Sequence, residues 1–331
     1  MPEKMKHVHA EVALAFGPIP SRRLGRSLGI NNIPPKTCSY SCVYCQVGPT
    51  SAQEIAPRAF YAPQDILAAV AGHVDRLRER GERIDYLTFV PDGEPTLDAN
   101  LAETIDALKP LGISVAVISN ASLVWRDGVR DAMSRADWVS LKVDAVDESV
   151  WKKVNRPHPD LSLVDILDGI CTFAASYRGT LATETMLVAD ANDSEVALTG
   201  VAEYLAQLGP HTAYLGIPIR PPAVPGTRSP DEATLNWAFQ TFSAKLQRVE
   251  LLTGYEGDAF AATGDAEADL LAITAVHPMR EQAVRALLER SGADWSLVER
   301  LIGDGALRQV SYAGARFYVR RLPLESGRHA K

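Results

Sequence analysis

The sequence predicts an α/β protein with a mainly parallel sheet, followed by a smaller α+β domain. Between about residues 27 and 220, short apolar runs rich in β-branched residues alternate with longer helical patterns, and this alternation is typical of β-α-β units. After the proline-rich segment 220–226, the pattern changes to helices followed by two strands. The chain of 331 residues has the length of about two domains.

The main part contains six predicted strands. They cover residues 27–33, 85–90, 113–119, 138–144, 180–189 and 212–219. The helices expected between them cover about residues 64–80, 98–110, 125–135, 161–177 and 193–208. Several of these helices begin at Asp or Ser, whose side chains cap helix N-termini. Six strands allow either a doubly wound sheet or part of a barrel, and in both architectures the functional loops follow the carboxyl ends of the strands.

The end of the chain has a different pattern. The elements expected there are helices over about 231–248, 279–290 and 294–303 and strands over 307–312 and 316–321. The two strands are joined by a short turn and form a hairpin. Helix, turn, helix and hairpin follow one another in the same order in a winged helix. We therefore expect a main domain over residues 1–228, a helical and acidic connector over 229–270, and a winged-helix-like α+β domain over 271–325.

The composition is that of an ordinary globular protein. The chain carries 41 acidic and 34 basic residues, and its net charge of −7 argues against a nonspecific binder of nucleic acid or membranes. It contains no apolar run long enough to span a membrane, and its first residues lack the apolar core of a secretory signal. We expect a cytoplasmic protein with no membrane partner. From His277 onward, ten bases outnumber six acids, so the main part is the acidic one.

Three of the four cysteines fall within eight residues. Cys38, Cys42 and Cys45 have the spacing C-x3-C-x2-C, directly after the first predicted strand. In a reducing compartment, such a concentration indicates metal binding rather than disulfides. A zinc site needs four ligands, and no nearby Cys or His supplies the fourth, whereas three thiolates suit a [4Fe–4S] cluster with one open iron. Zinc completed by a distant residue such as His73 is the alternative.

The cysteine spacing, with Tyr44 before the last cysteine, resembles the signature of radical S-adenosylmethionine (SAM) enzymes. The resemblance implies that Cys38, Cys42 and Cys45 bind a [4Fe–4S] cluster whose open iron binds SAM, with Tyr44 beside the cofactors. The reduced cluster would cleave SAM to methionine and a 5′-deoxyadenosyl radical, which abstracts hydrogen from a substrate. The resemblance also implies a flavodoxin- or ferredoxin-type electron donor and a partial (β/α)6 barrel of the TIM type, which matches the six predicted strands.

Residues at two further strand ends agree with this resemblance. Gly93-Glu94-Pro95 follows the second strand and is similar to the Gly-Glu motif that holds the SAM ammonium group in that family. A cationic amine needs acceptors, and glycine permits close approach of the backbone. Ser119 and Asn120 end the third strand, where a hydroxyl and an amide can bind the SAM carboxylate or ribose. A helix N-cap is the alternative role for this pair.

Polar residues on the fourth and fifth strands form a second set of candidates. Ser140, Lys142 and Asp144 lie on one face of a strand because successive side chains alternate. A lysine and an aspartate facing a barrel interior are costly unless they are paired or functional. We expect Ser140 to contact SAM. The candidate catalytic or substrate-contacting residues are Lys142, Asp144, Glu184 and, in the loop after the fourth strand, His158. A structural Lys–Asp pair is the alternative.

The resemblance narrows to a group of iron–sulfur oxidoreductases related to the tRNA wybutosine-synthesis enzyme. It rests on segments 17–29, 36–38, 144–147, 155–158 and 184–188. The wybutosine enzyme has additional N-terminal cysteines that hold a second cluster. Residues 1–37 of this chain contain no cysteine, so the resemblance does not imply that this chain catalyses the reaction of that enzyme.

Four residues outside the cluster motif also need an interpretation. Arg22, Arg23 and Arg26 precede the first predicted strand, where they either bind a phosphate-bearing substrate or pair with acids. The fourth cysteine, Cys171, lies in an apolar helix, which predicts a buried structural thiol.

Three functions follow from these features. The first is modification of an RNA base or nucleotide. The second is modification of a peptide or protein, which the winged-helix-like domain would bind by adding a strand to its hairpin. The helix over 294–303 carries Asp294 and Glu299 against Arg300, which is a poor phosphate-binding surface. The third is a zinc-bound winged-helix regulator without catalysis. The oligomeric state is left open.

Overall fold

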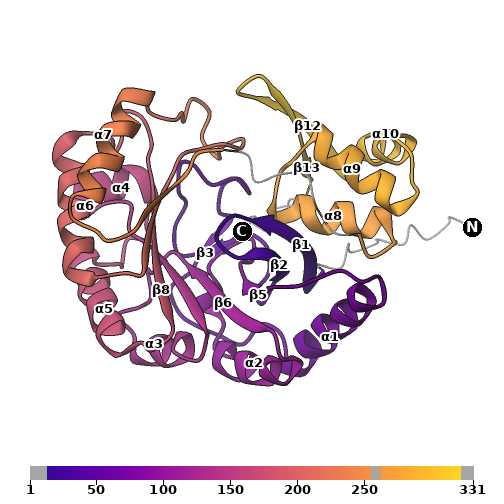
Figure 1. The fold of residues 1–331 in the computed structure, drawn as a ribbon, viewed down its shortest axis with the longest axis horizontal. Helices are drawn as coiled ribbons and strands as arrows, with labels where there is room; N and C mark the ends of the chain where they lie inside the picture. Colours follow the sequence, from indigo (N-terminus) through magenta and orange to yellow (C-terminus); the bar gives the residue numbers. More distant parts are fainter. Residues whose placement is uncertain (1–12, 255–259, 261, 322–331) are drawn as a thin grey trace, which may run out of the picture.

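The computed structural model describes residues 13–254, 260 and 262–321, and its main part is an eight-stranded sheet. In spatial order the strands are β1 (Ala15–Ser21), β2 (Gly25–Ile30), β5 (Tyr86–Phe89), β6 (Ser114–Ser119), β7 (Trp138–Lys142), β8 (Thr180–Met186), β9 (Thr212–Gly216) and β10 (Val249–Leu252). The strands from β2 to β10 are parallel, and β1 pairs antiparallel with β2. The sheet curls into an open half-barrel, which confirms the predicted partial barrel (Figure 1).

Helices cover the convex outer face of the sheet (Figure 1). They are α1 (Pro63–Glu79), α2 (Leu101–Leu108), α3 (Asp127–Met133), α5 (Leu163–Ser176), α6 (Glu195–Leu208) and α7 (Glu232–Ser243). The sequence explains their orientation: in α1, Ile66, Val70, Val74 and Leu77 recur at helical spacing and are fully buried. The short elements β3 (Thr37–Cys38), β4 (Ala52–Gln53), η1 (Pro95–Leu97) and η2 (Lys109–Leu111) lie in the connections.

Besides the short elements in the connections, the strands β1 and β10 and the helix α4 were not predicted from the sequence. Strand β1 contains Gly17-Pro18-Ile19-Pro20, and proline is tolerated in a strand mainly at a sheet edge. Strand β10 has four residues, all only partly buried, so its apolar pattern is weak. Helix α4 (Glu148–Asn155) is short and polar, and it begins where the Asp147 side chain accepts hydrogen bonds from two backbone N–H groups.

The barrel interior and the outer core use alternate residues of each strand. In β7, Val139 and Leu141 pack against the helices, whereas Lys142 faces the interior. Near the amino ends of the strands, a separate apolar cluster fills the interior; it contains Leu24, Ala116, Trp138, Ala182 and Tyr214.

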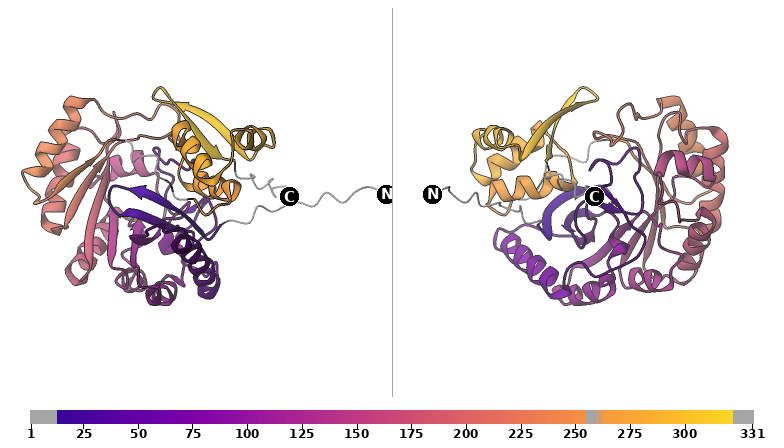
Figure 2. Two further views of the ribbon diagram at one scale, coloured as in Figure 1. Left: turned by 45° about the vertical axis from the view of Figure 1, so that its right-hand side comes forward. Right: turned by 180° about the vertical axis from the view of Figure 1, so that it is seen from behind.

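The C-terminal unit runs from α8 to β13. Its elements are α8 (Ala266–Val276), β11 (Met279–Arg280), α9 (Glu281–Ser291), α10 (Ser296–Gly303), β12 (Leu307–Tyr312) and β13 (Ala315–Arg320). Its strands form an antiparallel sheet in the order β11-β13-β12, with β12 at an edge. The unit lies beside the β1 edge of the barrel, where α8 packs against β1 (Figures 1 and 2).

The predicted connector over residues 229–270 is divided between the barrel and the C-terminal unit. In the predicted connector 229–270, β10 belongs to the barrel sheet, whereas Phe260 and Leu270 lie in the core of the C-terminal unit. The two helices and the hairpin expected at the end of the chain are present, and α8 and β11 are additional. The winged-helix assignment stays a prediction, and residues 322–325 of that domain lie outside the described residues.

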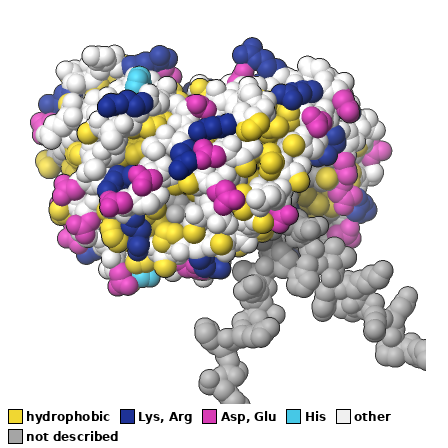
Figure 3. Space-filling view, turned by 90° about the horizontal axis from the view of Figure 1, so that it is seen from below, with side chains coloured by type: hydrophobic (Ala, Val, Ile, Leu, Met, Phe, Trp, Pro, Cys, Tyr) yellow, Lys and Arg dark blue, Asp and Glu magenta, His cyan; other side chains and the backbone are white. Residues whose placement is uncertain are grey.

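The surface of the described residues has two features that bear on partners. None of the described helices combines the length and the apolar character needed to cross a membrane. On the face shown in Figure 3, Lys and Arg side chains are mixed with Asp and Glu side chains rather than gathered in a region of one sign.

Candidate active site

The loop after β2 carries all three clustered cysteines to the open end of the barrel. Cys38, Cys42 and Cys45 line one cavity of about 310 Å³, which lies at the carboxyl ends of the parallel strands. The loop is anchored on the segment after β7, because the Val43 N–H donates to the Val154 carbonyl oxygen (2.9 Å). His158 belongs to the same anchor, since its backbone N–H donates to the Ser39 carbonyl oxygen (2.9 Å).

The cysteine sulfurs lie in buried surroundings that contain amide donors. The Asn120 Nδ2 donates to Cys38 Sγ, and the Asn155 Nδ2 donates to Cys42 Sγ, each at 3.5 Å. Burial raises the pKa of all three thiols, that of Cys42 to about 12, so the unliganded cysteines are neutral. Three free thiols on one cavity, with N–H donors to sulfur, fit the donor set of an iron–sulfur cluster.

A zinc site completed by His73 is excluded by the fold. His73 is buried on α1, its Nε2 lies 2.9 Å from the Gly17 carbonyl oxygen, and it does not line the cavity. As the described side chains stand, no three His, Cys, Asp or Glu residues form a group that could hold a single metal ion.

Gly93 brings the backbone after β5 against the cysteine loop. A Cβ atom at this position would lie 1.8 Å from the Thr37 carbonyl oxygen, so only glycine fits. The same oxygen accepts a hydrogen bond from the Glu94 N–H (3.1 Å). Gly93 lines the cavity, as expected for a backbone that approaches SAM closely, and Pro95 begins the η1 turn directly behind it.

The Glu94 carboxylate is turned away from the cavity into a hydrogen-bond network. It accepts from the Thr96 N–H and hydroxyl (3.1 and 2.6 Å), the Ser119 hydroxyl (2.8 Å) and the Asn120 N–H (2.7 Å). Burial raises the pKa of Glu94, and these hydrogen bonds oppose that shift. Glu94 therefore fixes the positions of Ser119 and Asn120. The Asn120 Nδ2 in turn donates a hydrogen bond to the Ser39 hydroxyl in the cysteine loop (2.9 Å).

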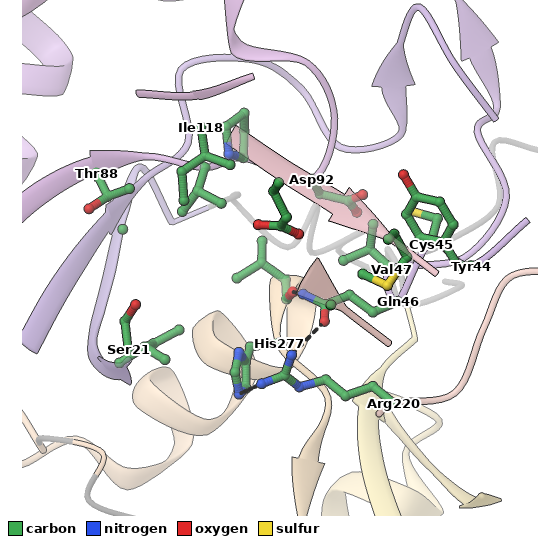
Figure 4. A pocket seen from close by; sticks show the side chains of 18 of the residues that line it. Ser21, Tyr44, Cys45, Gln46, Val47, Thr88, Asp92, Ile118, Arg220 and His277 are labelled. Atoms are coloured by element: carbon green, nitrogen blue, oxygen red, sulfur yellow. Dashed lines mark hydrogen bonds between the residues drawn. The ribbon is translucent and has the colours of Figure 1, made fainter. Parts of the chain in front are cut away.

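Asp92 is a cavity residue that was not singled out from the sequence. It is buried, points into the cavity and lies 3.1 Å from the Lys36 Nζ (Figure 4). Burial raises the pKa of Asp92 to about 6, against the opposing effect of Lys36. Its position directly before Gly93, in the segment whose resemblance implies a SAM contact, was the available signal.

Asp144 and Tyr44 form a buried structural pair. The Tyr44 hydroxyl donates to Asp144, and the same carboxylate accepts from the Asn155 Nδ2 (2.7 Å) and the Met186 N–H (2.8 Å). Tyr44 also lines the cavity, whereas Asp144 does not. Ser140 is buried in the barrel interior, outside the cavity lining, and its hydroxyl has no hydrogen-bond partner among the described residues.

Lys142 pairs with Glu184 on the neighbouring strand. Its Nζ lies 2.9 Å from the Glu184 Oε1 and 4.9 Å from the centre of the Tyr44 ring, and Arg23 pairs with the other carboxylate oxygen. Burial alone would raise the pKa of Glu184, but Arg23 and Lys142 outweigh it and lower the pKa to about 2. Lys142, Glu184 and Arg23 all line the cavity.

The other two arginines before β2 differ in their contacts. Arg26 pairs with Glu82, and Arg22 donates to the carbonyl oxygens of Leu251 (3.2 Å) and Gly254 (2.7 Å). Arg22 lines the cavity. The prediction that Cys171 is buried was wrong: it is exposed on α5, because the inner face of that helix is formed by other residues.

The described lining of the cavity is rich in positive charge. Its cationic side chains are Arg22, Arg23, Lys36, Lys142 and Arg220, and its carboxylates are Asp92 and Glu184. The chain as a whole carries −7, so this excess of cations is local to the cavity. Gln46, Arg220 and His277 also line it and were not candidates from the sequence (Figure 4).

Comparison with known proteins identifies the superfamily and the family. Residues 32–198 match the radical SAM superfamily. The chain is 43% identical over 313 residues to the UPF0026 protein of Methanocaldococcus jannaschii. This match covers 94% of this chain and 97% of that protein. It is 30% identical over 126 residues to an S-adenosylmethionine-dependent nucleotide dehydratase of Flammeovirga pacifica, over 36% of this chain and 42% of that protein.

A solved structure shows the same fold. A radical SAM methyltransferase from Sphaerobacter thermophilus superposes with a TM-score of 0.50 and 15% identity, over 69% of this chain and 66% of that protein. The half-barrel, the three cysteines and the sequence match make this chain a radical SAM enzyme, and superfamily membership implies a [4Fe–4S] cluster and SAM as cofactors. Within that superfamily, the chain belongs to the UPF0026 family. The hypothesis of a non-catalytic zinc protein is therefore wrong.

Proposed function

We propose that this enzyme modifies a nucleotide-related substrate, an RNA base or a nucleotide, by hydrogen abstraction. The observation that carries the proposal is the cavity in which the three cysteines face a lining whose described residues include five cationic side chains and two carboxylates. Arginine and lysine bind phosphate, so such a lining suits a phosphate-bearing substrate. The similarity to a nucleotide dehydratase over 126 residues supports the same substrate class.

The residues divide into three roles in this proposal. Cys38, Cys42 and Cys45 hold the cluster, which together with SAM supplies a 5′-deoxyadenosyl radical when a low-potential donor of the flavodoxin or ferredoxin type reduces it. Gly93 and Asp92 provide the backbone and carboxylate acceptors for the SAM ammonium group.

The remaining lining residues belong to the substrate side. Lys142 and Arg23, fixed by Glu184, present their positive charge to the same cavity. The cation–π contact of Lys142 with Tyr44 keeps that ammonium group next to the cysteine loop.

The test is substrate-dependent cleavage of SAM. Anaerobically reconstituted protein is mixed with SAM, dithionite and a panel of ribonucleosides, ribonucleotides, short RNAs and peptides, and 5′-deoxyadenosine is measured by chromatography. The proposal expects a ribonucleotide or an RNA to stimulate 5′-deoxyadenosine formation and to be altered in mass. Stimulation by peptides alone, with no response to any nucleotide or RNA, would overturn it.

A further inference from the structure

The C-terminal unit contributes two residues to the wall of the cavity. Helix α8 ends at Val276, and both Val276 and the following His277 line the cavity next to the cysteine loop. His277 is buried, and its ring packs edge-on against Phe260 at 5.4 Å between centres. The unit is held there by its contact with β1, whose Ile19 packs against the core of the unit. The cavity is therefore shared by the barrel and the C-terminal unit.

Three parts of the chain meet at Arg220 in this wall. Arg220 follows β9, and its Nη1 donates to the Oε1 of Gln46, the residue directly after Cys45 (2.9 Å). Its Nη2 lies 3.0 Å from the His277 Nε2, and the Gln46 Nε2 donates to the Val276 carbonyl oxygen (3.1 Å) (Figure 4). Burial and the neighbouring Arg220 hold the pKa of His277 well below its usual range, so its Nε2 accepts this hydrogen bond.

These contacts fix the orientation of one guanidinium group. Gln46 and His277 interact with different Nη atoms of Arg220, and because a guanidinium is planar and rigid, these two contacts define the orientation of its plane. Arg220 also contributes, with Arg23 and Lys142, to the positive potential that acts on Glu184 across the cavity. A planar donor group held in one orientation on a cationic wall is the arrangement that binds phosphate oxygens.

We infer that Arg220, oriented by His277 and Gln46, binds a phosphate group of the substrate. The inference rests on the proposed function and names a specific site for the phosphate. His277 and Gln46 are positioning residues, because they act through Arg220. The C-terminal unit is thereby a part of the active site and sets substrate specificity.

The experiment compares nucleotides with their parent nucleosides. Binding of the ribonucleoside 5′-monophosphates, the parent nucleosides and inorganic phosphate to the full-length, reconstituted, SAM-loaded protein is measured by calorimetry. The wild type should bind a monophosphate more tightly than its nucleoside. Arg220→Gln should weaken monophosphate binding about tenfold or more and leave nucleoside binding unchanged, since it removes a charge-assisted hydrogen bond. His277→Leu should lose part of the same preference, and His277→Gln, which restores an acceptor, should regain it.

The controls separate this inference from the proposed function. Arg135→Gln removes an exposed arginine that pairs with Asp106 outside the cavity, and it should leave all affinities unchanged. If the wild type binds neither nucleotides nor nucleosides, the proposed function fails. If the wild type prefers the monophosphate and Arg220→Gln keeps that preference, only the present inference is overturned. Should His277→Leu not fold, as judged by iron content and thermal unfolding, Arg220→Gln and Arg220→Lys decide alone.

Discussion

Lys142 and Glu184 are direct neighbours across the parallel strands β7 and β8, and their charged atoms lie 2.9 Å apart inside the barrel. The Glu184 side chain is 9% exposed and also pairs with Arg23. One buried carboxylate thus compensates two cations, and both of them line the cavity of the cysteines. Glu184 therefore offsets part of the positive charge that Lys142 and Arg23 bring to the cavity.

Glu184→Gln should destabilise the protein strongly. The variant leaves Lys142 and Arg23 without their carboxylate, and loss of one partner of a buried ion pair costs about 3–5 kcal/mol. Urea unfolding at neutral pH measures the loss. Glu82→Gln is the matched control, because Glu82 pairs with Arg26 nearer the surface and should cost less than about 1 kcal/mol. Equal losses in the two variants would contradict the account.

Gly93→Ala should disrupt the contact between the segment after β5 and the cysteine loop. The added Cβ would lie 1.8 Å from the Thr37 carbonyl oxygen, so the backbone must move, at a cost of about 1–3 kcal/mol. SAM affinity should fall as well, measured by calorimetry on the reconstituted protein. Gly128→Ala in α3 meets no atom within 4 Å, so it should leave SAM affinity unchanged, and it should not destabilise the protein, because alanine is the better helix former. Unaltered SAM binding in Gly93→Ala would show that this backbone does not approach the cofactor.

Asn120→Ala and Asn155→Ala should each lower the reduction potential of the cluster. Their amide groups donate to Cys38 and Cys42, and N–H donors at sulfur stabilise the more negative, reduced state. A redox titration followed by electron paramagnetic resonance measures the potential. Asn100→Ala, whose amide donates to the Tyr61 carbonyl oxygen, is the control. A potential that is unchanged in all three variants would argue against these hydrogen bonds.

Asp92 should make stability depend on pH in a defined window. Its folded-state pKa of about 6 is raised above the usual value for an aspartate, so between about pH 4 and pH 6 the folded state binds a proton that the unfolded state has released. Wild-type stability should therefore fall relative to Asp92→Asn as the pH rises through this window, by about 3 kcal/mol in total. Denaturant unfolding of the metal-free proteins at several pH values measures the difference. A difference that is independent of pH would refute the raised pKa.

Much of the site could be predicted because its signals are local in the sequence. Cys38, Cys42 and Cys45 share one loop, and Gly93 follows a strand whose carboxyl end has to reach the open side of a parallel barrel. The period of two placed Lys142 on the interior face. These features depend on short spacing and strand alternation, which a single sequence contains.

The rest of the site depends on contacts between distant segments. Lys142 pairs with Glu184 rather than Asp144 because of the register between β7 and β8, and the sequence of one strand does not define that register. Arg220 and His277 come together only because the C-terminal unit packs against β1. For Cys171 the prediction failed for a local reason: even an apolar helix has an exposed face, and Cys171 lies on the exposed face of α5.

We infer that Cys38, Cys42 and Cys45 hold a [4Fe–4S] cluster with one iron open to SAM. The most direct test of this inference is anaerobic reconstitution of the wild type, Cys42→Ala and Cys171→Ala, with iron and sulfide analysis and paramagnetic resonance of the reduced protein before and after addition of SAM. We expect about four irons per chain and a SAM-dependent change of the spectrum in the wild type and in Cys171→Ala, and loss of both in Cys42→Ala. A colourless wild type with one zinc per chain, or a Cys42→Ala variant that keeps the cluster and its response to SAM, would contradict it.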